Sequence, residues 1–515
     1  MKICPKCGAQ LDDNAAFCPS CGEKLSEVKK AEYNTAKKSS PVKNILANKK
    51  LLAICAACVV VVLLLIIIIA CAASSGNGGY ITTKGYTSFY QGDEKLYIVN
   101  AKGNITEVDV ESYKSESFDA YHANAIFIGE DDDTLYYFNG KKAVKVDEEV
   151  NYAYISQDGK NVVYTKDTTD DDAENDDIFT YSGGKPKKIV SGVNINAVSP
   201  DGKTVAYSVY DSDKGTTKGY YYDGKERELG KGKVAFAISN GAKYVYVLKE
   251  NDSEYTAYVQ KGTKDDSKVK LANISSYVFF NFDMSEIVYN TDDKAYISVK
   301  GKTPVKLSSS TVFPVLPSNI AAQFNVSSSI YQYRIGVKSF TEKFFSTGSK
   351  VVYLTKKYET NTAASGVDDA YLADDGKTII YLKDDSIRKV NGTKGNAEAV
   401  TLVEEDAKEL WITADGKTIF FENVDGELFS QKGTSKAKLI TDEKVDDLDI
   451  FKGKTLYYVV DGELYATTSG KGKKIGKLED ISWIIASDYR VDVKLSDGSI
   501  YTATNGKSFK LILGE

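Results

Sequence analysis

The nine residues Ser199-Pro200-Asp201-Gly202-Lys203-Thr204-Val205-Ala206-Tyr207 form a unit that recurs along this chain with the same order of residue types. The glycine of the unit is repeated after 43 residues between the first two clear copies and after 40 between the last two. The other clear copies are SQDGKNVVY (156–164), ADDGKTIIY (373–381) and TADGKTIFF (413–421), and degraded copies are SNGAKYVYV (239–247), NFDMSEIVY (281–289) and GKTLYYV (453–459).

Each copy specifies a turn followed by a strand. Asp-Gly makes a tight turn because glycine readily adopts positive φ, and a β-branched or alternating run such as Thr-Val-Ala-Tyr follows it. A second turn, as at 223–225, 425–427 and 461–463, then starts another short strand. A period of about 40 residues with several short strands is typical of a propeller blade. The pattern therefore predicts an all-β body over residues 85–515.

The repeated motif resembles the TolB-like and related β-propeller repeats, in which Ser-Pro-Asp-Gly-Lys leads into a central blade strand. Residues 199–203 match that pattern completely, whereas most other copies lack the proline. The resemblance covers roughly residues 85–515 and implies a propeller, for which we expect one ring of about seven or eight blades. Residues 302–350 contain no recognisable copy, so two smaller propellers that break near 310–345 are the alternative.

Residues 51–73 carry no charge and consist mostly of Val, Leu, Ile, Ala and Cys. About 20 apolar residues suffice for a helix to cross a hydrocarbon core of about 30 Å, so this run predicts a single transmembrane helix. A secretory signal peptide would have a shorter apolar core nearer the N-terminus. Ile68-Ile69-Ala70-Cys71 resembles a bacterial lipobox, and cleavage there with lipidation of Cys71 is the alternative.

The charges that flank this run predict its orientation. Residues 1–50 hold ten lysines and five acidic residues, whereas the whole chain has a net charge of −6. Because lysine-rich flanks stay in the cytoplasm, we expect a single-pass protein of the cell membrane with its N-terminus inside and its C-terminal body outside. The absence of cysteine from residues 74–515 is consistent with a Gram-positive envelope.

Four cysteines within the first 21 residues predict a metal site. They form two Cys-x-x-Cys-Gly knuckles, and four thiolates suit a closed, tetrahedral, structural zinc site rather than a catalytic one. The segment resembles the short zinc ribbons found at the N-termini of many bacterial proteins. Folding and zinc binding should be coupled in so small a core. The predicted ligands are Cys4, Cys7, Cys18 and Cys21.

The predicted domain order follows from these segments. Residues 1–25 form the zinc ribbon, 26–50 a flexible basic tether in the cytoplasm, 51–73 the transmembrane helix, 74–84 a linker and 85–515 the extracytoplasmic propeller. The lysines of the tether suit anionic lipid headgroups. Nucleic acid is a poor partner for the ribbon, because the ribbon contains acidic residues and lacks an aromatic and basic face.

Residue types that carry catalysis are scarce. His122 is the single histidine of the chain, so a catalytic triad would have to use it, and we expect a structural role instead. Acidic runs at 131–133 and 167–177 are expected to be solvated loops, with weak calcium binding possible in principle. We therefore expect no enzyme, although a carboxylate-based enzyme acting on glycans is an alternative. The repeated tyrosines (Tyr164, Tyr207, Tyr289 and Tyr381) and both tryptophans (Trp411 and Trp483) are expected to pack in the core.

The order of the modules suggests a function. An outer propeller would bind a protein, a peptide or an envelope glycan, and the inner zinc ribbon would dock a protein partner. The alternative is an envelope scaffold or assembly factor that carries no signal across the membrane.

Overall fold

The computed structural model describes residues Lys2–Ile3, Gln10–Leu11, 79–167, 176–251, 254–271, 274, 277–327, 330–395 and 397–514. The chain divides into two compact units, Met1–Cys71 and Ala72–Glu515. In the first unit β1 (Lys2–Ile3) pairs antiparallel with β2 (Gln10–Leu11). The predicted transmembrane run 51–73 lies outside the described residues. Among the residues that the structure describes, no helix is long and apolar enough to span a membrane.

The second unit is an all-β body, as the repeats predict, and its strands form sheets in chain order. Most sheets have four antiparallel strands. The first sheet contains β3 (Ser88–Gln91), β4 (Leu96–Val99) and β5 (Ile105–Val108), and the second contains β6 (Tyr113–Phe118), β7 (Ala125–Gly129), β8 (Leu135–Phe138) and β9 (Ala143–Asp147). A seven-stranded sheet follows with β10 (Tyr152–Ile155), β11 (Val162–Asp167), β12 (Asp176–Tyr181), β13 (Lys187–Val198), β14 (Val205–Asp211), β15 (Thr216–Tyr222) and β16 (Glu226–Lys231).

The long strand β13 explains the size of the seven-stranded sheet. Its first half pairs with β12 and its second half with β14, so two four-stranded units share one strand. The next sheet contains β17 (Lys233–Ile238), β18 (Val245–Asn251), β19 (Glu254–Lys261) and β20 (Lys264–Lys270), with the short 3₁₀ turn η1 (Asn240–Ala242) between its first two strands. The sheet after it contains β21 (Tyr277–Asn281), β22 (Glu286–Asn290), β23 (Ala295–Val299), β24 (Val305–Ser308), β26 (Ala322–Ser327) and β27 (Ile330–Ile335).

The C-terminal half returns to sheets of four strands. The first contains β25 (Phe313–Val315), β28 (Phe344–Thr347), β29 (Lys350–Leu354) and β30 (Thr360–Ser365). The second contains β31 (Asp369–Leu372), β32 (Thr378–Lys383), β33 (Ser386–Asn391) and β34 (Val400–Val403). The third contains β35 (Ala407–Ile412), β36 (Thr418–Asn423), β37 (Leu428–Lys432) and β38 (Lys438–Thr441). The last two are β39 (Asp447–Phe451), β40 (Thr455–Val460), β41 (Glu463–Thr467) and β42 (Lys473–Lys474), then β43 (Ile481–Ala486), β44 (Val491–Leu495), β45 (Ile500–Ala503) and β46 (Lys510–Leu513).

The repeated motif forms the turn between the first two strands of a unit. Gly202 has a φ of 68°, the left-handed conformation expected of glycine in such a turn. The Ser199 hydroxyl donates to the Asp201 carboxylate at 2.7 Å and accepts the amide of Thr204 at 2.9 Å, which fixes the turn. The strand after the turn then enters the core. The tyrosines predicted to be buried are confirmed as core residues: Tyr164, Tyr207, Tyr289 and Tyr381.

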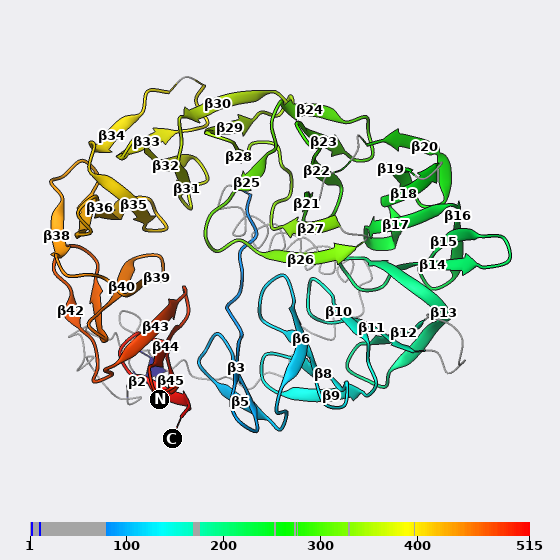
Figure 1. Ribbon diagram of the computed structural model, residues 1–515, viewed down its shortest axis with the longest axis horizontal. Coiled ribbons are helices and arrows are strands. Elements are labelled where there is room, and N and C mark those ends of the chain that lie inside the picture. The colour runs from blue at the N-terminus through cyan, green and yellow to red at the C-terminus, as the bar shows by residue number, and fades with distance from the viewer. Residues whose placement is uncertain are drawn as a thin grey trace, which may run out of the picture. The chain divides into compact units, whose positions relative to one another are not determined.

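Neighbouring sheets pack against each other through shared hydrophobic clusters, and the series returns to its starting point. Leu96 of the first sheet packs with Phe127 of the second, and such clusters continue from each sheet to the next. Val99 of the first sheet packs with Ile500 of the last. Figure 1 accordingly shows the sheets following one another around a common centre, from β3 through β15, β29 and β36 to β43.

A network of polar side chains joins the last sheet to the first. Arg490, which is 4% exposed, pairs with Asp492 on β44 through nitrogen–oxygen distances of 2.7–2.9 Å. The same guanidinium donates to the carbonyl oxygens of Val99 at 2.7 Å and Asn100 at 2.8 Å. The Tyr90 hydroxyl of β3 donates to Asp492. This arginine therefore satisfies backbone acceptors at the end of β4 and a carboxylate of β44 at once.

The described residues of the second unit form ten sheets, which is more than the seven or eight blades predicted. The reason is that residues 302–365 and 481–513 form sheets although they carry no clear copy of the motif. The alternative of two smaller propellers is not what the structure has, since residues 72–515 are one compact unit. One hydrophobic cluster, with Phe279, Phe344 and Ile379, continues across the proposed break.

The middle of the chain forms a hairpin toward the centre of the unit. Its strand β27 pairs in parallel with β21, and β26 completes the edge of that sheet (Figure 1). Residues 80–83, which the sequence assigned to the end of a linker, bridge to this region: Tyr80 pairs with Val337 and Thr82 with Ile320.

The hairpin buries its polar face and leaves its aromatic face exposed. Arg334, 2% exposed, donates to Gln323 at 3.0 Å and to the carbonyl of Val198 at 3.1 Å. On the opposite face Phe324 is 49% and Tyr331 40% exposed, and their rings stack at 6.0 Å. Polar side chains of this hairpin are thus buried and aromatic side chains exposed, which is the reverse of the usual arrangement.

Candidate ligand-binding pocket

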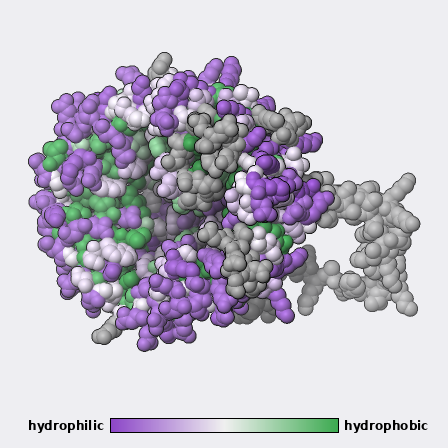
Figure 2. Space-filling model, turned by 45° about the vertical axis from the view of Figure 1, so that its right-hand side comes forward, coloured by the Kyte–Doolittle hydropathy of each residue, from purple (hydrophilic) through white to green (hydrophobic). Residues whose placement is uncertain are grey.

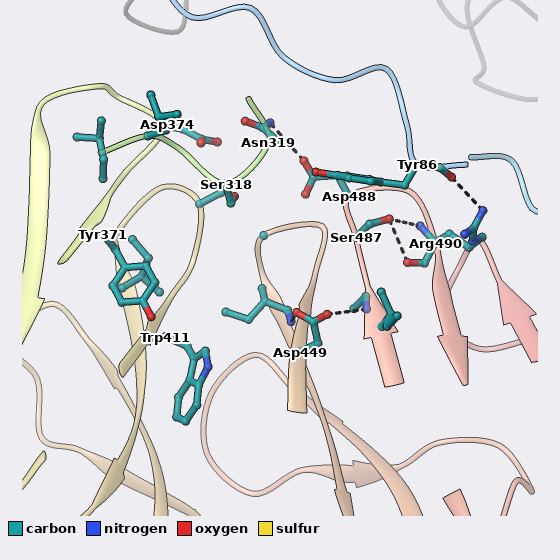
Figure 3. A pocket seen from close by; sticks show the side chains of 18 of the residues that line it. Tyr86, Ser318, Asn319, Tyr371, Asp374, Trp411, Asp449, Ser487, Asp488 and Arg490 are labelled. Atoms are coloured by element: carbon teal, nitrogen blue, oxygen red, sulfur yellow. Dashed lines mark hydrogen bonds between the residues drawn. The ribbon is translucent and has the colours of Figure 1, made fainter. Parts of the chain in front are cut away.

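A pocket of about 580 Å³ opens among the first strands of the C-terminal sheets. Strands β31, β35, β39 and β43 provide its walls, together with β3 and the segment that leads into β26. Figure 3 shows these side chains converging on one space, and Figure 2 shows hydrophobic side chains around a hollow in a mostly hydrophilic surface. A volume between about 300 and 1,000 Å³ is typical of small-molecule sites.

The repeated turns place the pocket residues. The amide of Asp374 donates to the carbonyl of Ala414 at 2.7 Å, and the amide of Ala414 donates to that of Gly453 at 2.8 Å. Asp374 and Ala414 are the second residues of their motif copies, the position filled by Pro200 in the complete copy. The turns of neighbouring sheets are therefore hydrogen-bonded to each other at this position. The residue that occupies this position lines the pocket in two adjacent sheets.

Four carboxyl groups line the pocket, those of Asp374, Asp449, Asp488 and Asp492. Burial and the nearby Asp488, Asp415 and Asp375 raise the pKa of Asp374. Burial also raises the pKa of Asp449, although this carboxylate accepts the amide of Ala486 at 2.8 Å. Burial, the largest cause of both shifts, disfavours the charged form of these carboxyls, and neighbouring carboxylates add to the shift at Asp374.

One amide side chain lies against the carboxylates. The Nδ2 atom of Asn319 donates to Asp488 at 3.3 Å, as Figure 3 shows. The Oδ1 atom of Asn319 is buried and has no hydrogen-bond partner among the described residues. An acceptor left in that state costs on the order of 1–3 kcal/mol.

Arg490 is the one cationic residue among the described residues that line the pocket. It is occupied by its pair with Asp492 and by carbonyl oxygens, including that of Tyr86 at 3.0 Å. Its charge is therefore neutralised inside the wall and does not offset Asp374 or Asp488.

Aromatic and aliphatic side chains form the rest of the lining. Tyr371 and Trp411 come from β31 and β35, and Ile485 from β43 is 53% exposed. Burial and Asp369 raise the pKa of Tyr371, so its hydroxyl stays protonated at neutral pH. The ring centroids of Tyr86 and His122 are 5.2 Å apart. The pocket thus combines apolar walls with acidic groups.

His122 takes a structural position, as expected. Its ring stacks on Phe118 at 5.5 Å, and its backbone has a φ of 53°. The hydroxyl of Thr87 donates to its carbonyl at 3.0 Å. Burial lowers the pKa of His122, while Asp119 opposes that shift.

The carboxylates of the first acidic run are engaged by neighbouring side chains. Asp132 accepts the hydroxyl of Thr134 at 2.6 Å, and Asp133 pairs with Lys114. Residues 168–175 of the second run lie outside the described residues. Among the described residues, no cluster of three His, Cys, Asp or Glu side chains is placed to hold a metal ion.

The predicted role of Trp411 was incomplete, because this side chain lines the pocket besides packing beside a core cluster. Trp483 packs against Tyr90 at a ring distance of 6.5 Å. The predicted zinc ligands Cys4, Cys7, Cys18 and Cys21 lie outside the described residues.

Sequence reasoning did not find Asn319, Asp488 or Arg490. They lie in segments without a clear motif copy, where no pattern set them apart from ordinary surface residues. Asp374 carried a usable signal, since an acidic residue stands where the complete copy has Pro200.

Comparison of the chain with known protein families and with curated proteins gives two results. Residues 3–25 match the zinc-ribbon domain family. The chain carries a zinc ribbon at its N-terminus. No curated protein matches the chain.

Solved structures with similarity to the all-β body include TolB proteins. TolB from Acinetobacter baumannii is 14% identical, with 51% of this chain and 68% of that chain covered and a TM-score of 0.28. The putative TolB from Agrobacterium tumefaciens is 15% identical, with 41% and 84% covered and a TM-score of 0.27. The tricorn protease is 12% identical, with 77% and 57% covered and a TM-score of 0.25.

Proposed function

We propose that this chain is a single-pass membrane protein whose extracytoplasmic body, a β-propeller, binds a ligand in the pocket described above. The observation that carries the proposal is the pocket, where residues from four adjacent sheets and two distant segments converge. Binding sites of this kind place a few polar groups in a mainly apolar lining. The ligand would be a protein, a peptide or an envelope glycan, and the role would be non-enzymatic.

The zinc ribbon is proposed to dock a protein partner in the cytoplasm. Its four cysteines fit zinc by the chemistry of the donor set, since thiolates are preferred ligands of structural zinc. The pairing of β1 with β2 brackets the first knuckle with a reversal of the chain, which suits such a domain. The apolar run 51–73 and its lysine-rich flank support the membrane location.

A scaffold role in the cell envelope is the second candidate. The exposed aromatic face of Tyr277, Phe313, Phe324 and Tyr331 favours it, because contiguous exposed apolar side chains mark interaction surfaces. In that case the body would assemble with other envelope components, and the pocket would be secondary.

The two tryptophans of the chain allow a direct test of pocket binding. In full-length protein in lipid nanodiscs, Trp483→Phe leaves Trp411 as the single tryptophan, and its fluorescence reports on the pocket. We expect a saturable change with at least one of three probe classes: short peptides, wall disaccharides and polyols. No change with any probe up to millimolar concentration would contradict the proposal.

Location is tested separately on intact cells. Asp425→Cys introduces a thiol on an exposed turn of the body, which otherwise lacks cysteine. An impermeant maleimide should label this variant and not the wild-type protein. Labelling only after lysis would contradict the proposed orientation.

A further inference from the structure

We propose that the pocket recognises a cationic group, an ammonium or a guanidinium, carried on an apolar stem. This inference rests on the proposed binding function and names the chemistry of the ligand.

The charge of the pocket is unbalanced. Asp374, Asp449 and Asp488 face it, and none of them forms an ion pair with a cation of the described residues. Arg490 is fully engaged by Asp492 and backbone carbonyls. A positive group on the ligand would be attracted by the uncompensated carboxylates, whereas an anion would be repelled.

Hydrogen-bonding capacity points the same way. Asn319 already uses its amide nitrogen toward Asp488, and its buried oxygen has no partner. Asp488 lines the pocket, and an ionised carboxyl offers about four acceptor sites, of which the Asn319 amide uses one. Ammonium and guanidinium groups carry several donors and no acceptor, so they match a set of acceptors.

The walls suit the stem of such a ligand. Tyr371, Trp411 and Ile450 offer aromatic and aliphatic surface, and Ile485 is 53% exposed within the pocket. Aromatic faces also attract cations. A lysine or arginine side chain, or a free alkylamine, combines a methylene stem with a terminal cation and so fits both parts of the lining.

A bare metal ion is a poorer match than an organic cation. The apolar walls would have no role, and among the described residues no group of three His, Cys, Asp or Glu side chains is placed to hold a metal ion. Calcium is the metal ion that oxygen ligands would favour, so the test includes it as a competing outcome.

The test uses the full-length Trp483→Phe protein in nanodiscs with matched probes. They are Ac-Ala-Ala-Lys-Ala-Ala-NH₂, the same peptide with norleucine in place of lysine, spermidine and calcium chloride. We expect the lysine peptide to bind at least tenfold more tightly than the norleucine peptide, with weaker binding at high salt. Binding of spermidine without the peptide would identify a free amine as the source of the cation.

Charge-removing variants complete the design. Asp374→Asn and Asp488→Asn should each reduce the preference for lysine over norleucine, and the double variant should abolish it. Asp425→Asn, on an exposed turn that does not line the pocket, should leave it unchanged. Circular dichroism confirms that each variant is folded.

Equal binding of both peptides, or a response to calcium alone, would overturn the inference. Tight binding of a neutral probe would overturn it while leaving the proposed binding function intact. A lack of response to every probe would contradict both.

Discussion

The Nη1 atom of Arg490 donates to the carbonyl oxygen of Val99 at 2.7 Å, across 391 residues of chain. The bond joins the last sheet of the body to the first, and Asp492 holds the same guanidinium in place. A buried pair of this kind is sensitive to the loss of one partner, because the other is left as an uncompensated charge.

Replacing Arg490 with methionine should therefore destabilise the body by about 3–5 kcal/mol. Asp492, 1% exposed, would remain buried without its cation. Urea unfolding of the full-length protein measures the loss. The double variant Arg490→Met/Asp492→Leu should recover only part of it, because the carbonyl oxygens of Val99 and Asn100 and the Tyr90 hydroxyl stay without their partners. Lys474→Met, which removes a surface pair with Glu463, should cost less than about 1 kcal/mol. Equal effects of the two single variants would contradict this account.

Gly416→Ala should destabilise more than Gly426→Ala. Both glycines have positive φ, 62° and 85°, so each substitution carries backbone strain of about 1 kcal/mol. A Cβ at Gly416 would also lie 2.9 Å from the Cβ of Ala373, whereas a Cβ at Gly426 meets nothing within 4 Å. We expect a further loss of about 1–2 kcal/mol for Gly416→Ala in thermal and urea unfolding. Similar losses at both positions would mean that the approach of neighbouring sheets is unimportant.

Acidification should weaken the body through His122. Burial lowers the pKa of His122 below its ordinary value of 6.5, so the unfolded chain binds the proton more readily than the native protein. Stability should fall as the pH drops below about 6.5, by at most about 1.4 kcal/mol per pH unit, until the native pKa is reached.

The matched control is His122→Asn, because asparagine tolerates the positive φ of this position and does not titrate. Unfolding free energies between pH 7.5 and 5 should decline less steeply in the variant. Carboxyl groups whose pKa is raised without a contribution from His122, such as Asp374, act in the opposite direction in both proteins and cancel in the comparison. Parallel pH profiles would exclude a contribution from His122.

Zinc should bind to the ribbon and leave the body untouched. We expect about one zinc per chain by elemental analysis, lost on Cys7→Ser or Cys18→Ser and retained on Cys55→Ser. Chelation should not shift the unfolding of residues 72–515, which form a separate compact unit. A body that melts earlier after chelation would show that the two units depend on each other.

The repeats predicted much of the fold because they act locally. The Asp-Gly turn at Gly202 needs positive φ, and Tyr207 follows at a fixed spacing on a strand that enters the core, so both are readable from residue type and order. The number of sheets was not readable. The segment 481–513 contains an Asp-Gly turn at 497–498, but this turn joins the second and third strands of its sheet instead of the first and second, so a search for the motif does not find this sheet.

The pocket was less accessible to sequence reasoning than the fold. Asp488 and Asn319 are 169 positions apart, and their contact depends on how the whole body is assembled. The hairpin posed a different difficulty, because alternation separates two faces of a strand without stating which face is buried. Arg334 lies inside and Phe324 outside, which reverses the usual order.

The packing of Val99 and Tyr90 against Ile500 and Ile512 has a consequence for how such a chain can vary in length. A linear array of repeats must end in polar caps at both termini, and it tolerates the gain or loss of a repeat at either end. Here the two end faces cover each other, so neither needs a cap. Loss of one sheet would leave two apolar faces too far apart to meet, and for that reason we expect the size of the body to change by whole rearrangements rather than by single repeats.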